Sequence, residues 1–179
     1  MPDTTSERGL EFIKSFLLDL RPHIAYPTHL LGQAARAFDG ASTLGTSILC
    51  RAALEAAYCW FFQWTTDAGG RRGLINGPDG PKLLPDQERP GDHVNFGAIM
   101  QLVRESNLLS SAQLEASERI RRNGNWVAHM IQVTDRDRRK SPNPLDWTPW
   151  ITDREAWADL EDTADILKTL EDALPSIYR

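Results

Sequence analysis

The sequence contains few of the residues that build metal centres or disulfide frameworks: 2 cysteines and 4 histidines among 179 residues. Cys50 and Cys59 lie nine residues apart on one expected helix, so their side chains point to opposite sides and are roughly 13 Å apart. That separation is too large for a disulfide, and a zinc site would need more ligands at closer spacing. We therefore expect two buried, reduced thiols, no metal site and no cofactor.

The sequence also lacks an excess of positive charge and any apolar run long enough to cross a membrane. The net charge is −5, so affinity for nucleic acid or an anionic membrane would have to come from a local basic patch. The most apolar segment, residues 48–62, is too short for a membrane span and contains Arg51 and Glu55. The N-terminal residues show no signal-peptide pattern. We expect a cytoplasmic protein with no membrane role.

The dominant pattern is helical, because apolar side chains recur at helical spacing and convincing alternating strands are absent. It predicts a single all-α domain over residues 1–179, a bundle of about five to six helices with its core over about 30–172 and no sheet. The helix over about 41–64 is apolar on nearly every side and is expected at the centre. The other helices are expected over about 4–20, 28–38, 93–105, 111–130 and 152–174, with capping boxes at Thr4/Glu7, Ser110/Gln113 and Thr152/Glu155. Segments of about 66–92 and 135–152 are expected to be irregular loops.

Two charged residues in the middle of the central helix need partners, because a lone buried charge costs several kcal/mol. Arg51 and Glu55 are spaced four residues apart and could pair with each other at the rim of the core. Alternatively, Glu55 points at a cationic group on a neighbouring helix. The spacing leaves both arrangements open.

The second unusual segment is the expected helix over about 111–130. Ile120, Val127 and Ile131 share one face, which is the expected core side. Arg122 and His129 are seven residues apart, so they nearly eclipse each other on the opposite side, two turns apart. A solvated pair of residues and a functional arginine–histidine site both fit this spacing. The residues that border the same side are Arg119, Asn125 and Trp126.

Together, the two segments resemble a family. The sequence R-A-A-L-E at residues 51–55 and the later R-N-G-N-W-V-A-H at residues 122–129 are similar to paired motifs of the HEPN superfamily, in a bacterial branch of unknown function. The resemblance covers about residues 30–172, and the Gly- and Pro-rich segment and the Trp-rich segment depart from it. It implies a helical bundle that forms a homodimer, with metal-independent RNA cleavage or RNA binding in a shared cleft.

The resemblance also implies roles for individual residues. His129 would act as a general acid or base on the ribose 2′-hydroxyl or the leaving oxygen. Arg122 would clamp the phosphate and stabilise its developing charge, and Asn123 would hold the phosphate or orient the histidine. Glu55 would fix Arg122 or His129 in place. Three residues are expected to position the catalytic residues without reacting themselves: Glu55, Arg51 and Asn125.

A local excess of positive charge would allow RNA to bind. Residues 118–140 contain seven basic and three acidic side chains, in a chain that is acidic overall. The segment 136–140, followed by Trp147 and Trp150, could bind a single strand through phosphate contacts and stacking, or the tryptophans could pack back onto the bundle. The residues expected to contact RNA are Arg119, Arg121, Arg136, Arg138 and Arg139.

Three functional hypotheses follow. The first is a HEPN endoribonuclease that acts as a toxin or defence effector, with an antitoxin or another protein as a partner. The second is a non-catalytic HEPN module that dimerises and binds RNA, nucleotide or a protein partner without cleavage. The third is a purely structural helical dimer with no ligand.

Overall fold

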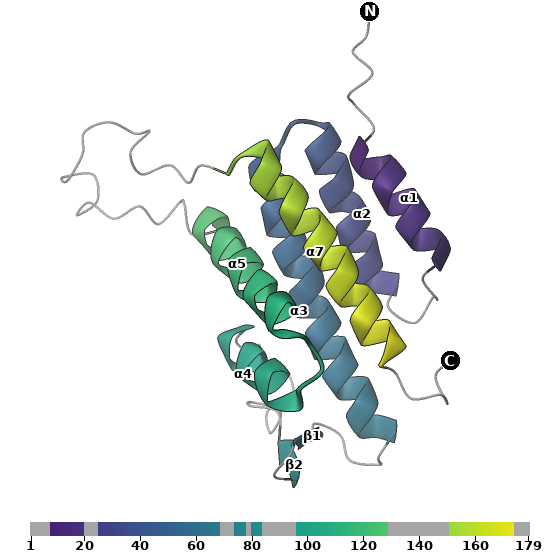
Figure 1. Ribbon diagram of the computed structural model, residues 1–179, viewed down its shortest axis with the longest axis vertical. Helices are drawn as coiled ribbons and strands as arrows, with labels where there is room; N and C mark the ends of the chain where they lie inside the picture. Colours follow the sequence, from purple (N-terminus) through teal and green to yellow (C-terminus); the bar gives the residue numbers. More distant parts are fainter. Residues whose placement is uncertain are drawn as a thin grey trace, which may run out of the picture.

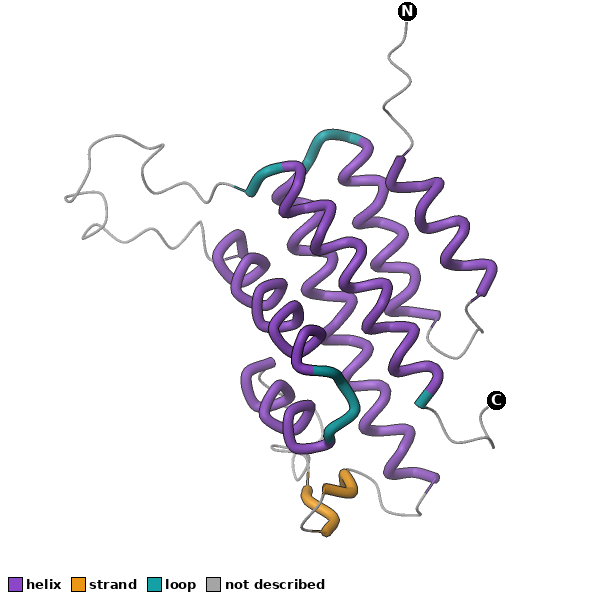
Figure 2. Tube along the Cα trace, viewed as in Figure 1, coloured by secondary structure: helices purple, strands orange, loops and turns teal. Residues whose placement is uncertain are grey.

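In the computed structural model, the described residues are 8–19, 25–68, 74–77, 80–83, 96–128 and 151–173. They form an all-α bundle, as the sequence predicts, with a small β-hairpin at one end (Figures 1 and 2). The helices in these ranges are α1 (Arg8–Asp19), α2 (Ala25–Asp39), α3 (Thr43–Ala68), α4 (Phe96–Ser106), α5 (Ser111–Ala128) and α7 (Asp153–Asp172).

Helix α3 is the central element, as its all-round apolar character predicts. It packs against α2, α5, α7 and α4, and α1 is added on the outer side of α2 (Figure 1). Leu54 and Tyr58 of α3 are fully buried among apolar side chains of the other helices. The Tyr58 hydroxyl is within 2.6 Å of the Ser117 hydroxyl of α5, so the buried phenol keeps a hydrogen bond that also joins the two helices.

Capping residues fix the helix starts at two of the three predicted places. The Ser110 amide donates to Gln113 Oε1 over 3.0 Å, and the Gln113 amide donates to Ser110 Oγ over 3.3 Å. Thr152 and Glu155 form the same reciprocal pair at the start of α7. Both predicted capping boxes are therefore confirmed. The third, Thr4/Glu7, lies outside the described residues.

The start of α1 is held by the end of α2. Both carboxylate oxygens of Asp39 accept hydrogen bonds, from the amides of Gly9 over 2.7 Å and Leu10 over 2.9 Å. A Cβ atom on Gly9 would lie 2.8 Å from the Ala35 carbonyl oxygen, so the two helix backbones meet closely here. The helix dipole favours a carboxylate at this position.

The hairpin corrects one part of the sequence analysis. Strands β1 (Leu74–Gly77) and β2 (Gly80–Leu83) pair antiparallel, with Leu74 opposite Leu83 and Gly77 opposite Gly80. They lie beside α3 and α4 (Figure 2), within the segment expected to be an irregular loop, in a fold expected to have no sheet. Each strand has only four residues and contains glycine or proline, which are rare in strands, so no alternating pattern marks them. Helix α3 also continues to Ala68, beyond its expected end near residue 64.

Among the described helices, none combines the length and apolar character that crossing a bilayer requires.

Candidate functional site

Helix α5 carries the residues of the second motif. Ile120 and Val127 are buried on its inner face, while Arg122 is exposed, so the arginine does face away from the core, as predicted. The helix is unbroken through the Asn-Gly-Asn sequence. His129 directly follows Ala128, the last residue of α5, and lies outside the described residues, so its predicted position beside Arg122 stays a prediction.

The glycine of the second motif lies against the arginine of the first. Gly124 is buried, and a Cβ atom placed on it would be 2.5 Å from both Cβ and Cδ of Arg51 and 3.0 Å from its Cγ. A glycine at this position therefore lets α5 approach the aliphatic part of the Arg51 side chain. The two motifs that carry the family resemblance meet at this crossing of α3 and α5.

Arg51 and Glu55 pair with each other. Arg51 Nη2 is 3.3 Å from Glu55 Oε2, and about a quarter to a third of each side chain is exposed. Of the two arrangements that the spacing leaves open, the structure shows the ion pair within one helix, and within the described part of the chain Glu55 has no ion pair with a neighbouring helix. The Arg51 guanidinium also lies 5.5 Å from the centre of the Phe96 ring, a cation–π distance. No described residue accepts a hydrogen bond from the buried Arg51 Nε.

A fully buried carboxylate anchors α5 to α3 and α7. Asp159 of α7 is 0% exposed and accepts hydrogen bonds from Ser47 Oγ (2.8 Å), Arg119 Nε (3.1 Å) and Asn123 Nδ2 (3.3 Å). Arg119 Nη2 also donates to Asp162 over 2.6 Å. Burial lowers the pKa of Arg119, but the hydrogen bonds to Asp162 and Asp159 outweigh it, so the pKa lies above its ordinary value. This network compensates the buried charge.

Sequence reasoning missed Asp159, although its spacing was informative. It lies three residues after Ala156 and four before Thr163, and all three are buried on the same side of α7. A polar residue at core spacing in an amphipathic helix must find a buried partner. The apolar spacing of a helix does not by itself mark such a residue.

Two of the arginines predicted to contact RNA are engaged in ion pairs with acidic side chains. Arg119 is bound to Asp159 and Asp162, and Arg121 Nε lies 2.9 Å from Glu118. Glu118 also pairs with Arg104 of α4. The other three predicted RNA contacts, Arg136, Arg138 and Arg139, lie outside the described residues. Contact of any of these arginines with RNA stays a prediction.

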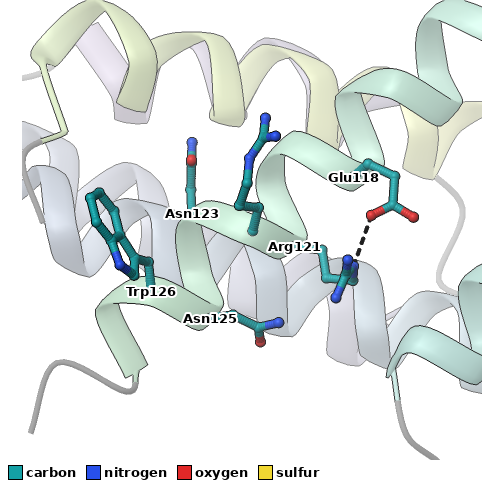
Figure 3. Close-up of a pocket in the computed structure, with 6 residues that line it drawn as sticks. Glu118, Arg121, Asn123, Asn125 and Trp126 are labelled. Atoms are coloured by element: carbon teal, nitrogen blue, oxygen red, sulfur yellow. Dashed lines mark hydrogen bonds and ion pairs between the residues drawn. The ribbon is translucent and has the colours of Figure 1, made fainter. Parts of the chain in front are cut away.

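An open pocket of about 590 Å³ lies along the outer side of α5, within the usual volume range of small-molecule sites. Figure 3 shows the Arg121 side chain turned toward Glu118, while Asn123 and Trp126 extend on a different side of the helix from Asn125. Within the described part of the chain, Arg122 has no ion-pair partner. The described lining consists of Glu118, Arg121, Arg122, Asn123, Asn125 and Trp126.

The structure therefore brings Arg122, Asn123 and Asn125 to one pocket. Glu55 and Arg51 lie on the neighbouring helix, and no hydrogen bond or ion pair joins Glu55 to Arg122 in the described part of the chain, so the supporting role of Glu55 stays a prediction. Among the residues that the structure describes, no three His, Cys, Asp or Glu side chains are grouped as metal ligands would be.

Comparison with protein-family models, curated proteins and solved structures gives no match to this chain. The resemblance to the HEPN superfamily therefore stays a prediction from the two sequence motifs.

Proposed function

We propose that this protein is a HEPN-type, metal-independent endoribonuclease that works as a homodimer, with a role as a toxin or defence effector. The observation that carries the proposal is the position of Arg122: an exposed cation with no ion-pair partner among the described residues, lining a pocket beside Asn123. A guanidinium that no carboxylate occupies is available to bind a phosphate in a bidentate manner.

In the proposed reaction, the ribose 2′-hydroxyl attacks the adjacent phosphorus and the 5′-oxygen leaves. His129 removes the proton from the hydroxyl or supplies one to the leaving oxygen. Arg122 stabilises the negative charge that grows on the phosphate oxygens. The products are a cyclic phosphate and a 5′-hydroxyl, and DNA is not cleaved because it lacks the attacking group.

The hydrogen-bond network around Asp159 supports this proposal by fixing α5. Asp159 binds Arg119 and Asn123, which flank Arg122 on either side in the sequence and project toward α7. These contacts fix the backbone of α5 on either side of Arg122. The arginine that would bind the phosphate therefore extends from a defined backbone position. Such preorganisation is what charge stabilisation in a transition state requires.

The test is incubation of the purified chain with single-stranded RNA in the presence of EDTA. We expect cleavage to cyclic phosphate ends, with a loss of roughly 100-fold or more in His129→Ala and in Arg122→Ala, as for removal of an acid–base or charge-stabilising group. Arg36→Ala, which removes an exposed arginine of α2, is the matched control and should keep full activity. RNA that stays intact with the wild-type protein would refute the enzyme.

One observation favours a second candidate, a HEPN module that binds RNA without cleavage. The Asn123 amide donates to buried Asp159, which leaves it less free to hold a phosphate. In this case RNA remains intact but shifts on a gel with the wild-type protein, and Arg122→Ala abolishes the shift. An intact RNA that does not shift would refute both candidates.

A further inference from the structure

Trp126 is one of two large apolar side chains that stand exposed among the described residues. It is 62% exposed, and Tyr26 on α2 is 66% exposed. Isolated exposed aromatics are normal on protein surfaces, so exposure alone is no sign of a site. Trp126 differs from Tyr26 because it lines the pocket on α5, whose other described lining residues are polar or charged.

The position of Trp126 relative to Arg122 is the second observation. The two residues are four apart on α5, so their side chains are neighbours, with Cβ atoms about 6 Å apart in a regular helix. Both are exposed, and Trp126 extends from α5 apart from the Arg121–Glu118 pair (Figure 3). The pocket thus combines an unpaired cation, a flat aromatic surface and the amide of Asn125.

This combination matches the chemistry of a nucleotide. A phosphate binds to a guanidinium, a base stacks on an indole ring, and side-chain amides can hydrogen-bond to the edge of an unpaired base. A phosphate alone would bind Arg122 without contacting the indole ring of Trp126. An apolar ligand would contact the ring but would give the Arg122 guanidinium no hydrogen-bond acceptor. A pocket of about 590 Å³ has room for a ligand larger than a phosphate.

We propose that Trp126 is the platform on which a base of single-stranded RNA stacks while an adjacent phosphate lies on Arg122. The inference rests on the proposed function and adds to it the substrate class, an unpaired strand, since the indole can meet the face of a base only where that face is not covered by its neighbours. Stacking is tolerant of sequence because every base has an aromatic face. Trp126 therefore supplies affinity for unpaired RNA with little preference among bases.

The experiment measures binding by fluorescence anisotropy in the chain of 179 residues carrying His129→Ala, which prevents cleavage. The probes are a short, labelled oligoadenylate RNA and a ribose-phosphate strand of the same length without bases. We expect Trp126→Leu to weaken binding of oligoadenylate by about 5- to 150-fold, the range for loss of one stacked base, and to leave binding of the base-free strand unchanged. Trp126→Phe should keep most of the affinity because a ring remains.

Two control variants make the result specific. Tyr26→Leu removes the other exposed aromatic and should leave binding of both probes unchanged. Arg122→Ala should weaken both probes alike, because it removes a phosphate contact. Circular dichroism should show unaltered thermal unfolding for Trp126→Leu, since the ring is mostly in solvent.

Several outcomes would overturn the proposal. A change of less than about twofold in Trp126→Leu, with Arg122→Ala still weakening both probes, removes the stacking role and leaves the proposed function standing. An equal loss for the base-free strand shows that stacking is not the cause. Conversion of a dimer to a monomer by Trp126→Leu in analytical ultracentrifugation shows that a second copy covers the ring. If neither probe binds, the stacking role and the proposed function both fail.

Discussion

Replacing Gly124 by alanine tests the crossing of α3 and α5, where the two motifs meet. The new Cβ atom would lie 2.5 Å from Arg51 Cβ, about 0.9 Å short of the 3.4 Å at which ordinary contact begins. The contacts with Cγ and Cδ can be relieved by a change of rotamer. The contact with Cβ cannot, because that atom is fixed to the backbone of α3. The helices must therefore separate.

Two effects of opposite sign set the size of the change in stability. Alanine is better than glycine in a helix interior by about 0.8–1 kcal/mol, which alone would stabilise the protein. Forcing an extra carbon into a packed crossing costs about 1–3 kcal/mol, and the upper half of that range applies because one contact is with a fixed atom. We expect a net loss of about 1–2 kcal/mol, or a melting temperature lower by about 2–8 °C for a chain of this size.

The assay is thermal and chemical unfolding of Gly124→Ala beside Gly32→Ala. Gly32 lies inside α2, and a Cβ atom placed on it meets nothing within 4 Å, so it isolates the helix-propensity effect. We expect Gly32→Ala to be more stable than the wild type by about 0.8–1 kcal/mol. If Gly124→Ala is as stable as Gly32→Ala, the close crossing does not exist in solution and the reasoning fails.

Other consequences can be measured in the same preparations. Asp159→Ala should lower the free energy of unfolding by about 3 kcal/mol, the lower end of the range for breaking a buried ion pair. The lower end applies because Asp162 still neutralises Arg119. An unchanged denaturation midpoint would contradict a stabilising role of this network. Hydrogen bonds from the backbone amide and the hydroxyl of Thr152 lower the pKa of Glu155. The Glu155 carboxylate therefore stabilises the fold at pH values above the ordinary pKa of a glutamate. This stabilisation is lost as the pH falls through the lowered pKa of Glu155 in the folded protein. Glu155→Gln should therefore be less stable by about 0.3–1 kcal/mol at neutral pH, a difference that closes in acid.

Cys50 is buried as expected, whereas Cys59 is only partly buried, contrary to the expectation from the sequence. Burial raises the pKa of the Cys50 thiol, and partial burial raises that of Cys59 to about 11. Iodoacetamide at mildly alkaline pH should accordingly leave both thiols unmodified in the native protein and alkylate both in denaturant. Intact mass measures the result, and rapid native labelling of Cys50 would contradict its burial.

Local signals were enough to predict most of the helical architecture. Apolar spacing located the helices, and the capping residues Ser110 and Thr152 placed two helix starts, because both signals act within a few residues of the chain. The outward direction of Arg122 followed in the same way from its angle to Ile120. Each of these inferences needs only the geometry of one helix.

What depends on a contact between distant segments could not be predicted. The Asn-Gly-Asn sequence looks like an interruption of α5 until Arg51, far away in the sequence, is seen to lie against Gly124. Asp159 looks like one more charge on an amphipathic helix until its three donors from α3 and α5 are known. The residue pattern of each segment does not indicate which distant residues contact it.

The crossing at Gly124 also determines how α5 is rotated about its own axis. Each residue turns a helix by about 100°, so moving the contact point by a single position would place Asn123 or Asn125 between the two backbones and push them apart. Only one rotational setting brings Gly124 against α3. The direction in which Arg122 points is thus decided by a residue that has no side chain.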